Sequence, residues 1–148
     1  MSPSFNALLC DLPRNEYELL TAKMELVYLS AGQTLFTVDE APTHLYFPVG
    51  ATVSMMIDLA GSPGLEINIF ACECLVGFIS AEHPSFYRAS VRTSGLAYQL
   101  EMADFLNIKN ECPTFLERIH LMTDRHINHV SISTLCHQHH QVTHQLVH

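Results

Sequence analysis

The feature of this sequence that most constrains its fold is a series of short segments with a two-residue period between residues 25 and 100. Turn signals such as Ala31-Gly32 and Val49-Gly50 separate the segments. About eight strands at roughly ten-residue spacing predict an antiparallel sandwich, barrel or roll. The expected strands are Leu26–Leu29, Gln33–Val38, His44–Pro48, Ala51–Leu59, Leu65–Phe70, Cys74–Phe78, Tyr87–Thr93 and Gly95–Leu100.

The period is helical on both sides of this region. Before it, Ser4–Leu12 and Asn15–Met24 predict two short helices, the second capped by Asn15. The first presents an apolar face made of Phe5, Leu8, Leu9 and Leu12. After it, Ala103–Ile108 predicts a short helix, and Thr114 to about His137 predicts a long one with Pro113 in its first turn.

These elements predict a mainly β fold with flanking helices. The expected architecture is an eight-stranded antiparallel β-roll (a double-stranded β-helix, or jelly roll) with N-terminal helices and a long C-terminal helix. We expect the roll and N-terminal helices over residues 1–111, the long helix over 112–137, and a further segment over 138–148. A chain of 148 residues is long enough to bury such a core in one domain.

Charge and composition narrow the function and the compartment. Seven Lys plus Arg against fifteen Asp plus Glu give a net charge of −8, which disfavours nucleic-acid binding by this chain itself. The sequence has no apolar run long enough for a membrane span and no basic N-terminal region typical of a signal peptide. We therefore expect a cytoplasmic protein whose five cysteines are thiols.

The stretch from Phe70 to Glu101 carries the clearest candidate site. Glu73 lies on a short turn between Cys72 and Cys74, and Arg88 and Arg92 lie in a predicted strand. A carboxylate and two arginines in a chain with so few charges predict a pocket for a small anion.

Local motifs in the same order resemble the cyclic-nucleotide-binding domain of the Crp/Fnr family of bacterial transcription regulators. The motifs are Asn6-Ala7-Leu8-Leu9 with Leu12-Pro13, Leu29-Ser30-Ala31-Gly32-Gln33-Thr34-Leu35, Asp39-Glu40-Ala41-Pro42, His44-Leu45-Tyr46-Phe47-Pro48, Cys72-Glu73-Cys74-Leu75-Val76-Gly77 and Tyr87-Arg88-Ala89. The resemblance implies a sensory roll, a dimerisation helix and a following helix-turn-helix domain. We expect this chain to end where that DNA-binding domain begins, so that DNA is bound only through a domain that the chain lacks.

The resemblance also implies a ligand cassette, which binds cAMP or cGMP where it is intact. Its residues here are Cys72, Glu73, Cys74, Tyr87, Arg88 and Ala89, with Ser131 approaching from the long helix. Glu73 is placed to accept a ribose hydroxyl. Cys72, however, stands where the family has a glycine, and Tyr87 where it has the phosphate-binding arginine. Arg88 is one residue away, on the opposite face of a strand, so we predict a degenerate pocket.

The apolar stripe of the long helix predicts a homodimer across a two-fold axis. The expected interface residues are Leu116, Ile119, Met122, His126, Ile127 and Val130. The alternative is that this stripe packs against its own roll. A His126 or His129 pair across the axis predicts a pH-sensitive dimer.

Beside the sensory domain, which is the first hypothesis, a candidate metal site and two other functional hypotheses remain. Eight of the ten histidines lie between His120 and His148, and His137, His140, His144 and His148 have helical spacing that suits zinc, nickel or copper, although we predict a solvated face without metal. A stand-alone module that binds a small molecule or a metal is the second hypothesis.

A cupin-like enzyme is the third hypothesis, but it needs a cluster of His and Glu on the strands, and His44 is the only histidine in the expected strands. The common catalytic motifs are absent from the sequence, so we predict that the chain is not an enzyme.

Overall fold

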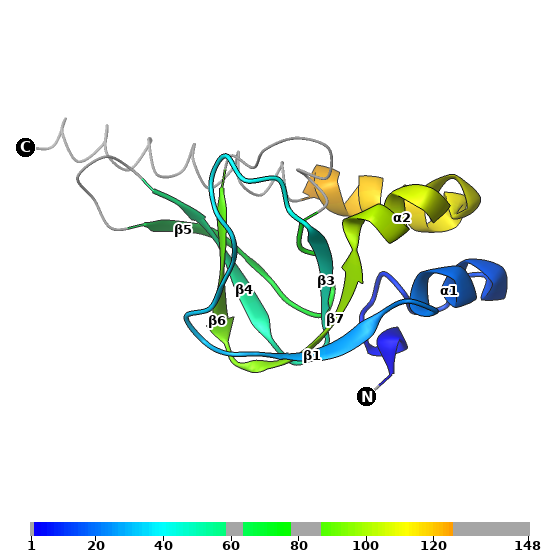
Figure 1. Ribbon diagram of the computed structural model, residues 1–148, viewed down its shortest axis with the longest axis horizontal. Helices are drawn as coiled ribbons and strands as arrows, with labels where there is room; N and C mark the ends of the chain where they lie inside the picture. Colours follow the sequence, from blue (N-terminus) through cyan, green and yellow to red (C-terminus); the bar gives the residue numbers. More distant parts are fainter. Residues whose placement is uncertain (1, 59–63, 78–86, 126–148) are drawn as a thin grey trace, which may run out of the picture.

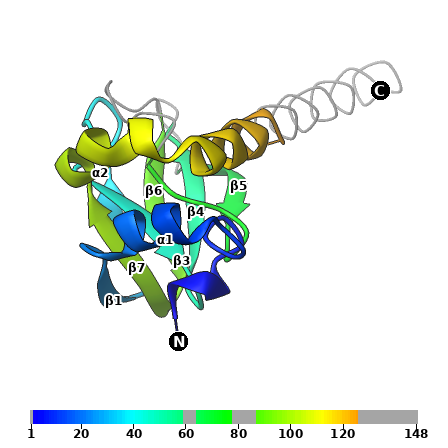
Figure 2. The ribbon, with the colours of Figure 1, turned by 90° about the vertical axis from the view of Figure 1, so that its right-hand side faces the viewer.

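The computed structural model describes residues 2–58, 64–77 and 87–125. It contains two antiparallel sheets with helices at one side, as Figures 1 and 2 show. The elements in chain order are η1 (Pro3–Phe5), α1 (Arg14–Thr21), β1 (Glu25–Leu29), β2 (Thr34–Phe36), β3 (His44–Pro48), β4 (Thr52–Ile57), β5 (Leu65–Phe70), β6 (Arg88–Thr93), β7 (Gly95–Glu101), α2 (Met102–Ile108) and η3 (Lys109–Glu111). A further helix covers residues 113–125.

The strands form a three-stranded sheet in the order β1-β7-β3 and a four-stranded sheet in the order β2-β6-β4-β5. The β6–β7 connection joins the two sheets at Ser94, between β6, which pairs with β2 and β4, and β7, which pairs with β1 and β3. The predicted mainly β roll with flanking helices is thereby confirmed. No helix among the described residues is long and apolar enough to cross a membrane.

One of the eight predicted strands, Cys74–Phe78, is reduced to a single bridge in its described part. Val76 and Tyr46 exchange two backbone hydrogen bonds of 2.9 and 3.0 Å. A turn closed by the Cys74 N–H and the Ala71 carbonyl lies before it, and Gly77 follows with a φ of +109°. Only two residues between these turns are left to extend, so a longer ladder cannot form.

The N-terminal segment also differs from the predicted helix over Ser4–Leu12. A 3₁₀ turn over Pro3–Phe5 is followed by turns, because the Asn6 side chain accepts a hydrogen bond from the Leu8 N–H at 3.0 Å. Leu8, Leu9 and Leu12 are buried as predicted, but Phe5 is 60% exposed. The predicted cap at Asn15 is wrong, because α1 begins at Arg14 after Pro13 and Asn15 lies inside its first turn.

The helices cover the outer face of the three-stranded sheet. Phe47 on β3 contacts Phe115 at a ring-centroid distance of 6.0 Å, and Phe105 on α2 contacts Phe115 at 6.1 Å. All three are fully buried, together with Ile119. Burial of each such side chain contributes roughly 1.5–3 kcal/mol, so Phe115 and Ile119 form part of the core of their own chain.

Candidate ligand-binding site

The acidic turn of the cassette lies on the surface with Glu73 exposed. Cys72 is also exposed, and its Sγ approaches Glu73 Oε2 at 3.9 Å. Cys74 is buried, and burial raises the pKa of its thiol to about 12, so it stays protonated at neutral pH. Of the predicted turn residues, Glu73 thus offers an accessible acceptor and Cys74 belongs to the core.

The predicted strand half of the cassette is not a cationic pocket. Tyr87 is 1% exposed, and its ring lies 5.3 Å from that of Phe36 and 6.3 Å from that of Phe70. Burial raises the pKa of Tyr87, opposed by a backbone hydrogen bond with Gly77. Ala89 and Val91 on the same face are also buried. The inward side of β6, together with Tyr87 directly before it, therefore presents one aromatic ring and two aliphatic side chains.

Arg88 points to the other face of β6 and is occupied there. Its Nε and Nη2 donate to the two carboxylate oxygens of Asp58, both at 3.0 Å. The hydrogen bond from Arg88 lowers the pKa of Asp58, and the same bond raises the pKa of Arg88. A Cβ at Gly64 would lie 2.7 Å from Arg88 Nη2, so the chain passes close over the pair. The bidentate geometry leaves this guanidinium engaged by a fixed partner.

Arg92, four residues further along β6, follows the same pattern. Its Nε lies 3.3 Å from Glu66 Oε1, and Ser54 also donates to Glu66. Both arginines of the predicted anion pocket thus have carboxylate partners on β5 or at the end of β4. The structure brings neither of them into contact with Glu73 among the described residues.

Glu73 instead belongs to a different hollow of about 220 Å³. This hollow lies between the N-terminal turns, the acidic turn and helix 113–125, and Arg118, Met122 and Arg125 also line it. The sequence gives no signal that places Arg118 or Arg125 at the site, because both lie more than forty residues beyond Glu73 in the chain.

The backbone of the acidic turn is fixed by the N-terminal segment. Asn6 is fully buried, and its amide donates to the Cys74 carbonyl at 2.8 Å and to the Pro48 carbonyl at 3.0 Å. The Ala7 N–H donates to the Cys72 carbonyl at 2.8 Å. Sequence analysis missed this role of Asn6. The available signal was one amide side chain among the apolar residues that form the buried face of that segment.

Helix 113–125 is anchored to the same region at three points. The Leu75 N–H donates to Met122 Sδ at 3.4 Å, and the Phe115 N–H donates to the buried carboxylate of Glu16 at 2.9 Å. Arg118 donates to the carbonyls of Leu8 at 3.3 Å and Asp11 at 3.2 Å, and also to that of Cys10. The acidic turn and helix 113–125 are therefore one connected unit.

The predicted dimer interface needs correction in its described part. Ile119 is fully buried and Met122 is 5% exposed, both within the core of their own chain, and Leu116 packs against that core. These side chains follow the alternative prediction, in which the stripe packs against its own roll. Leu121 is 53% exposed on this helix. His126, Ile127, Val130 and Ser131 lie outside the described residues, as does the segment 138–148.

A metal site has no support in the described part of the chain, where no three His, Cys, Asp or Glu side chains gather. The histidines of the predicted metal alternative, from His126 onward, lie outside that part. The four described cysteines, Cys10, Cys72, Cys74 and Cys112, form no disulfide.

Comparison with known proteins identifies the fold. No family model matches the sequence, and no curated protein matches it. The catabolite activator protein of Thermus thermophilus is similar to it in structure, with a TM-score of 0.70, 16% identity, and coverage of 93% of this chain and 63% of that one. The c-di-GMP-responsive global regulator CLP of Xanthomonas campestris has a TM-score of 0.69, 13% identity, and coverage of 82% and 63%.

A third similar structure is the N-terminal domain of a transcriptional regulator from Streptomyces coelicolor A3(2), with a TM-score of 0.63, 18% identity, and coverage of 90% of this chain and 95% of that one. This chain spans about 63% of the length of the first two regulators. The chain shares its fold with these regulators, and the fold implied by the sequence resemblance is confirmed.

Proposed function

We propose that this chain is the sensory and dimerisation domain of a Crp/Fnr-like transcription regulator whose cyclic-nucleotide cassette is degenerate. The observation that carries the proposal is the arrangement of β6, with Tyr87 packed into the core and Arg88 paired with Asp58 on the outer face. A cyclic phosphate in the roll needs an unpaired cation, which the described inner face of β6 does not provide.

The proposed mechanism is a population shift. A ligand that contacts the acidic turn changes its packing against Met122 and against the N-terminal segment held by Asn6. Met122 lies on helix 113–125, whose first turn is held by the hydrogen bond from the Phe115 N–H to Glu16. A change at the acidic turn therefore alters how this helix packs on the roll. In the whole regulator, this change moves DNA-binding domains that follow the helix. We place this regulator in the cytoplasm.

Calorimetry with cAMP and cGMP tests the state of the cassette. We expect no saturable heat up to about 1 mM of either nucleotide, a limit that corresponds to a binding free energy weaker than roughly −4 kcal/mol. Saturable binding at micromolar concentration that Arg88→Met abolishes contradicts the proposed degeneracy. Binding of another small molecule or a metal by a monomeric chain favours the stand-alone module instead.

Sedimentation equilibrium tests the dimer. We propose that the exposed Leu121 contributes to a homodimer interface together with the predicted positions His126, Ile127 and Val130. Leu121→Glu is expected to raise the dissociation constant of the dimer at least tenfold, because it puts a charge where the proposed interface buries an apolar side chain. Leu65→Glu on β5, where the wild-type side chain is 50% exposed, is the matched control and is expected to leave the dimer unchanged. A monomeric wild-type chain overturns the dimer proposal.

A further inference from the structure

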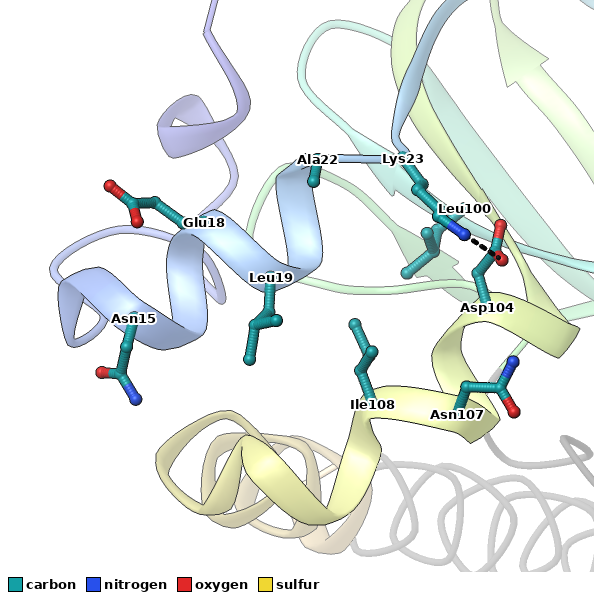
Figure 3. A pocket seen from close by; sticks show the side chains of 9 residues that line it. All are labelled: Asn15, Glu18, Leu19, Ala22, Lys23, Leu100, Asp104, Asn107 and Ile108. Atoms are coloured by element: carbon teal, nitrogen blue, oxygen red, sulfur yellow. Dashed lines mark hydrogen bonds and ion pairs between the residues drawn. The ribbon is translucent and has the colours of Figure 1, made fainter.

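A large concave site among the described residues lies outside the cassette. It is a pocket of about 520 Å³ between α1, α2 and β7, and Figure 3 shows the side chains that line it. No residue of the acidic turn or of β6 borders it. Its volume is within the range of roughly 300–1,000 Å³ that is typical of small-molecule sites.

The walls of this pocket are apolar. Leu19 on α1 and Ile108 on α2 point toward one another across the gap, and Leu100 of β7 lies at its base (Figure 3). Leu100 is buried in the core, whereas Leu19 and Ile108 are only partly buried. The two helices hold these side chains apart, so apolar surface remains open to a ligand.

One polar corner gives the pocket its chemical preference. Lys23 Nζ donates to Asp104 Oδ1 at 3.4 Å, and the Asp104 side chain is only 23% exposed. Nζ has three N–H groups and Asp104 has a second oxygen, Oδ2, for which the described part of the chain shows no partner. The corner therefore offers both a donor and an acceptor to one incoming group.

The charges around the pocket are balanced. Lys23 and Asp104 neutralise each other, and Glu18 at the rim is paired with Arg14 at 2.9 Å. A ligand carboxylate is repelled by the negative charges of Asp104 and Glu18, and a ligand ammonium is repelled by the positive charge of Lys23. A hydroxyl suits the corner better than either ion, because it donates to Asp104 Oδ2 and accepts from Lys23 Nζ.

We propose that this pocket is a second binding site, separate from the cassette, for a small neutral molecule with an apolar body and one hydroxyl group. The apolar body lies between Leu19 and Ile108 over Leu100, and the hydroxyl lies at the Lys23–Asp104 pair. The site stands independently of the proposed cassette, because it shares no lining residue with it.

The test uses three probes with one ring system: 2-naphthol, 2-naphthoate and 2-naphthylmethylammonium. Each is titrated into ¹⁵N-labelled full-length protein, and the amide shifts are followed by NMR. We expect 2-naphthol to shift the signals of Leu19, Leu100 and Asp104 and to bind at least threefold more tightly than either charged probe. Shifts confined to Tyr87, Ala89 and Val91, or tighter binding of the carboxylate, overturn the proposal.

Two variants with a control complete the test. Ala22 lies at the exposed end of α1 and lines the pocket, so Ala22→Phe fills its mouth and is expected to weaken 2-naphthol binding at least tenfold. Ala41→Phe, at another exposed alanine that does not line the pocket, should change binding less than twofold. Asp104→Asn should reverse the preference and favour 2-naphthoate. Equal losses in the two phenylalanine variants, or an unchanged preference in Asp104→Asn, contradict the site.

Discussion

The two halves of the candidate cassette, the acidic turn and the strand β6, differ in which of their groups the rest of the protein holds in place. In the acidic turn, backbone groups are held by Asn6 and Ala7 while the side chain of Glu73 is exposed to solvent. At the start of β6, the inward side chains of Ala89 and of Tyr87, directly before the strand, are themselves part of the core. A turn fixed through its backbone leaves a side chain available to a ligand. A strand position fixed by packing does not, because the side chain that fills the core excludes the ligand.

Truncation of Tyr87 is expected to have the largest effect and to show that the strand half is core. Tyr87→Ala removes a ring packed between Phe36 and Phe70 and should lower the free energy of unfolding by about 3–5 kcal/mol. Urea unfolding followed by circular dichroism measures it. Tyr28→Ala, at a side chain that is 63% exposed, is the control, with a change within about 0.5 kcal/mol. A loss as small as that of the control would place Tyr87 outside the core.

The same residue gives a pH prediction. Because burial raises the pKa of Tyr87 above its ordinary value near 10, the folded state keeps this proton at a pH where the unfolded state releases it. The stability that Tyr87 contributes is thus complete below about pH 10 and falls as the pH rises above that value. Tyr87→Phe should lack this fall. Parallel stability curves for the two proteins above pH 10 would show that the phenol is not buried.

Replacement of Asn6 tests the turn half. Asn6→Leu has a similar volume but leaves the carbonyls of Cys74 and Pro48 and the N–H of Leu8 without their partner. The expected loss in the free energy of unfolding is about 2–4 kcal/mol, since each buried unsatisfied group costs roughly 1–3 kcal/mol and some relaxation occurs. Asn15→Leu, at an exposed asparagine, should change stability by about 0.5 kcal/mol or less. An equal effect of both variants would contradict the claim that Asn6 holds the acidic turn in place.

Glu16 tests whether the long helix is attached to the roll as a unit. Glu16→Ala removes the cap on the Phe115 N–H and should cost about 1–2 kcal/mol. Hydrogen exchange of the Phe115 amide should become faster by roughly tenfold, which corresponds to about 1.4 kcal/mol of lost local stability. Glu18→Ala, which removes only an exposed ion pair on the same helix, is the control and should leave that amide unchanged. Unchanged exchange in Glu16→Ala would contradict the cap.

The smallest expected effect concerns the outer pair of β6. Arg88→Met removes the hydrogen bonds to Asp58, but exposed ion pairs contribute little to stability. Since Arg88 lowers the pKa of Asp58, the contribution of the pair is present above the ordinary aspartate pKa of about 4 and is lost as the pH falls through the lowered value. The melting temperatures of wild type and variant should therefore converge in acid. A difference that grows in acid would contradict the pairing.

Much of the fold could be predicted because it depends on local patterns. The two-residue period predicts seven strands that the structure contains, and it also predicts that Tyr87 and Arg88 lie on opposite faces, as the structure has them. The long-range hydrogen bonds of Asn6, Glu16 and Arg118 could not be predicted, since the partners in these bonds lie 42 to 110 residues away. An apolar stripe shows that a helix is covered but not by what, and for this reason Ile119 and Met122 were assigned to a partner instead of their own core.

The most direct test of the central claim is an NMR measurement of side-chain contacts around β6 in the presence of cAMP at about 1 mM. The account predicts nuclear Overhauser contacts from the Tyr87 ring to Phe36 and Phe70, and an Arg88 Nε–H signal that is unchanged by the nucleotide. Loss of the Tyr87 contacts together with a shifted Arg88 signal would mean that the strand rearranges to present its arginine to the phosphate. That result would contradict the degenerate cassette.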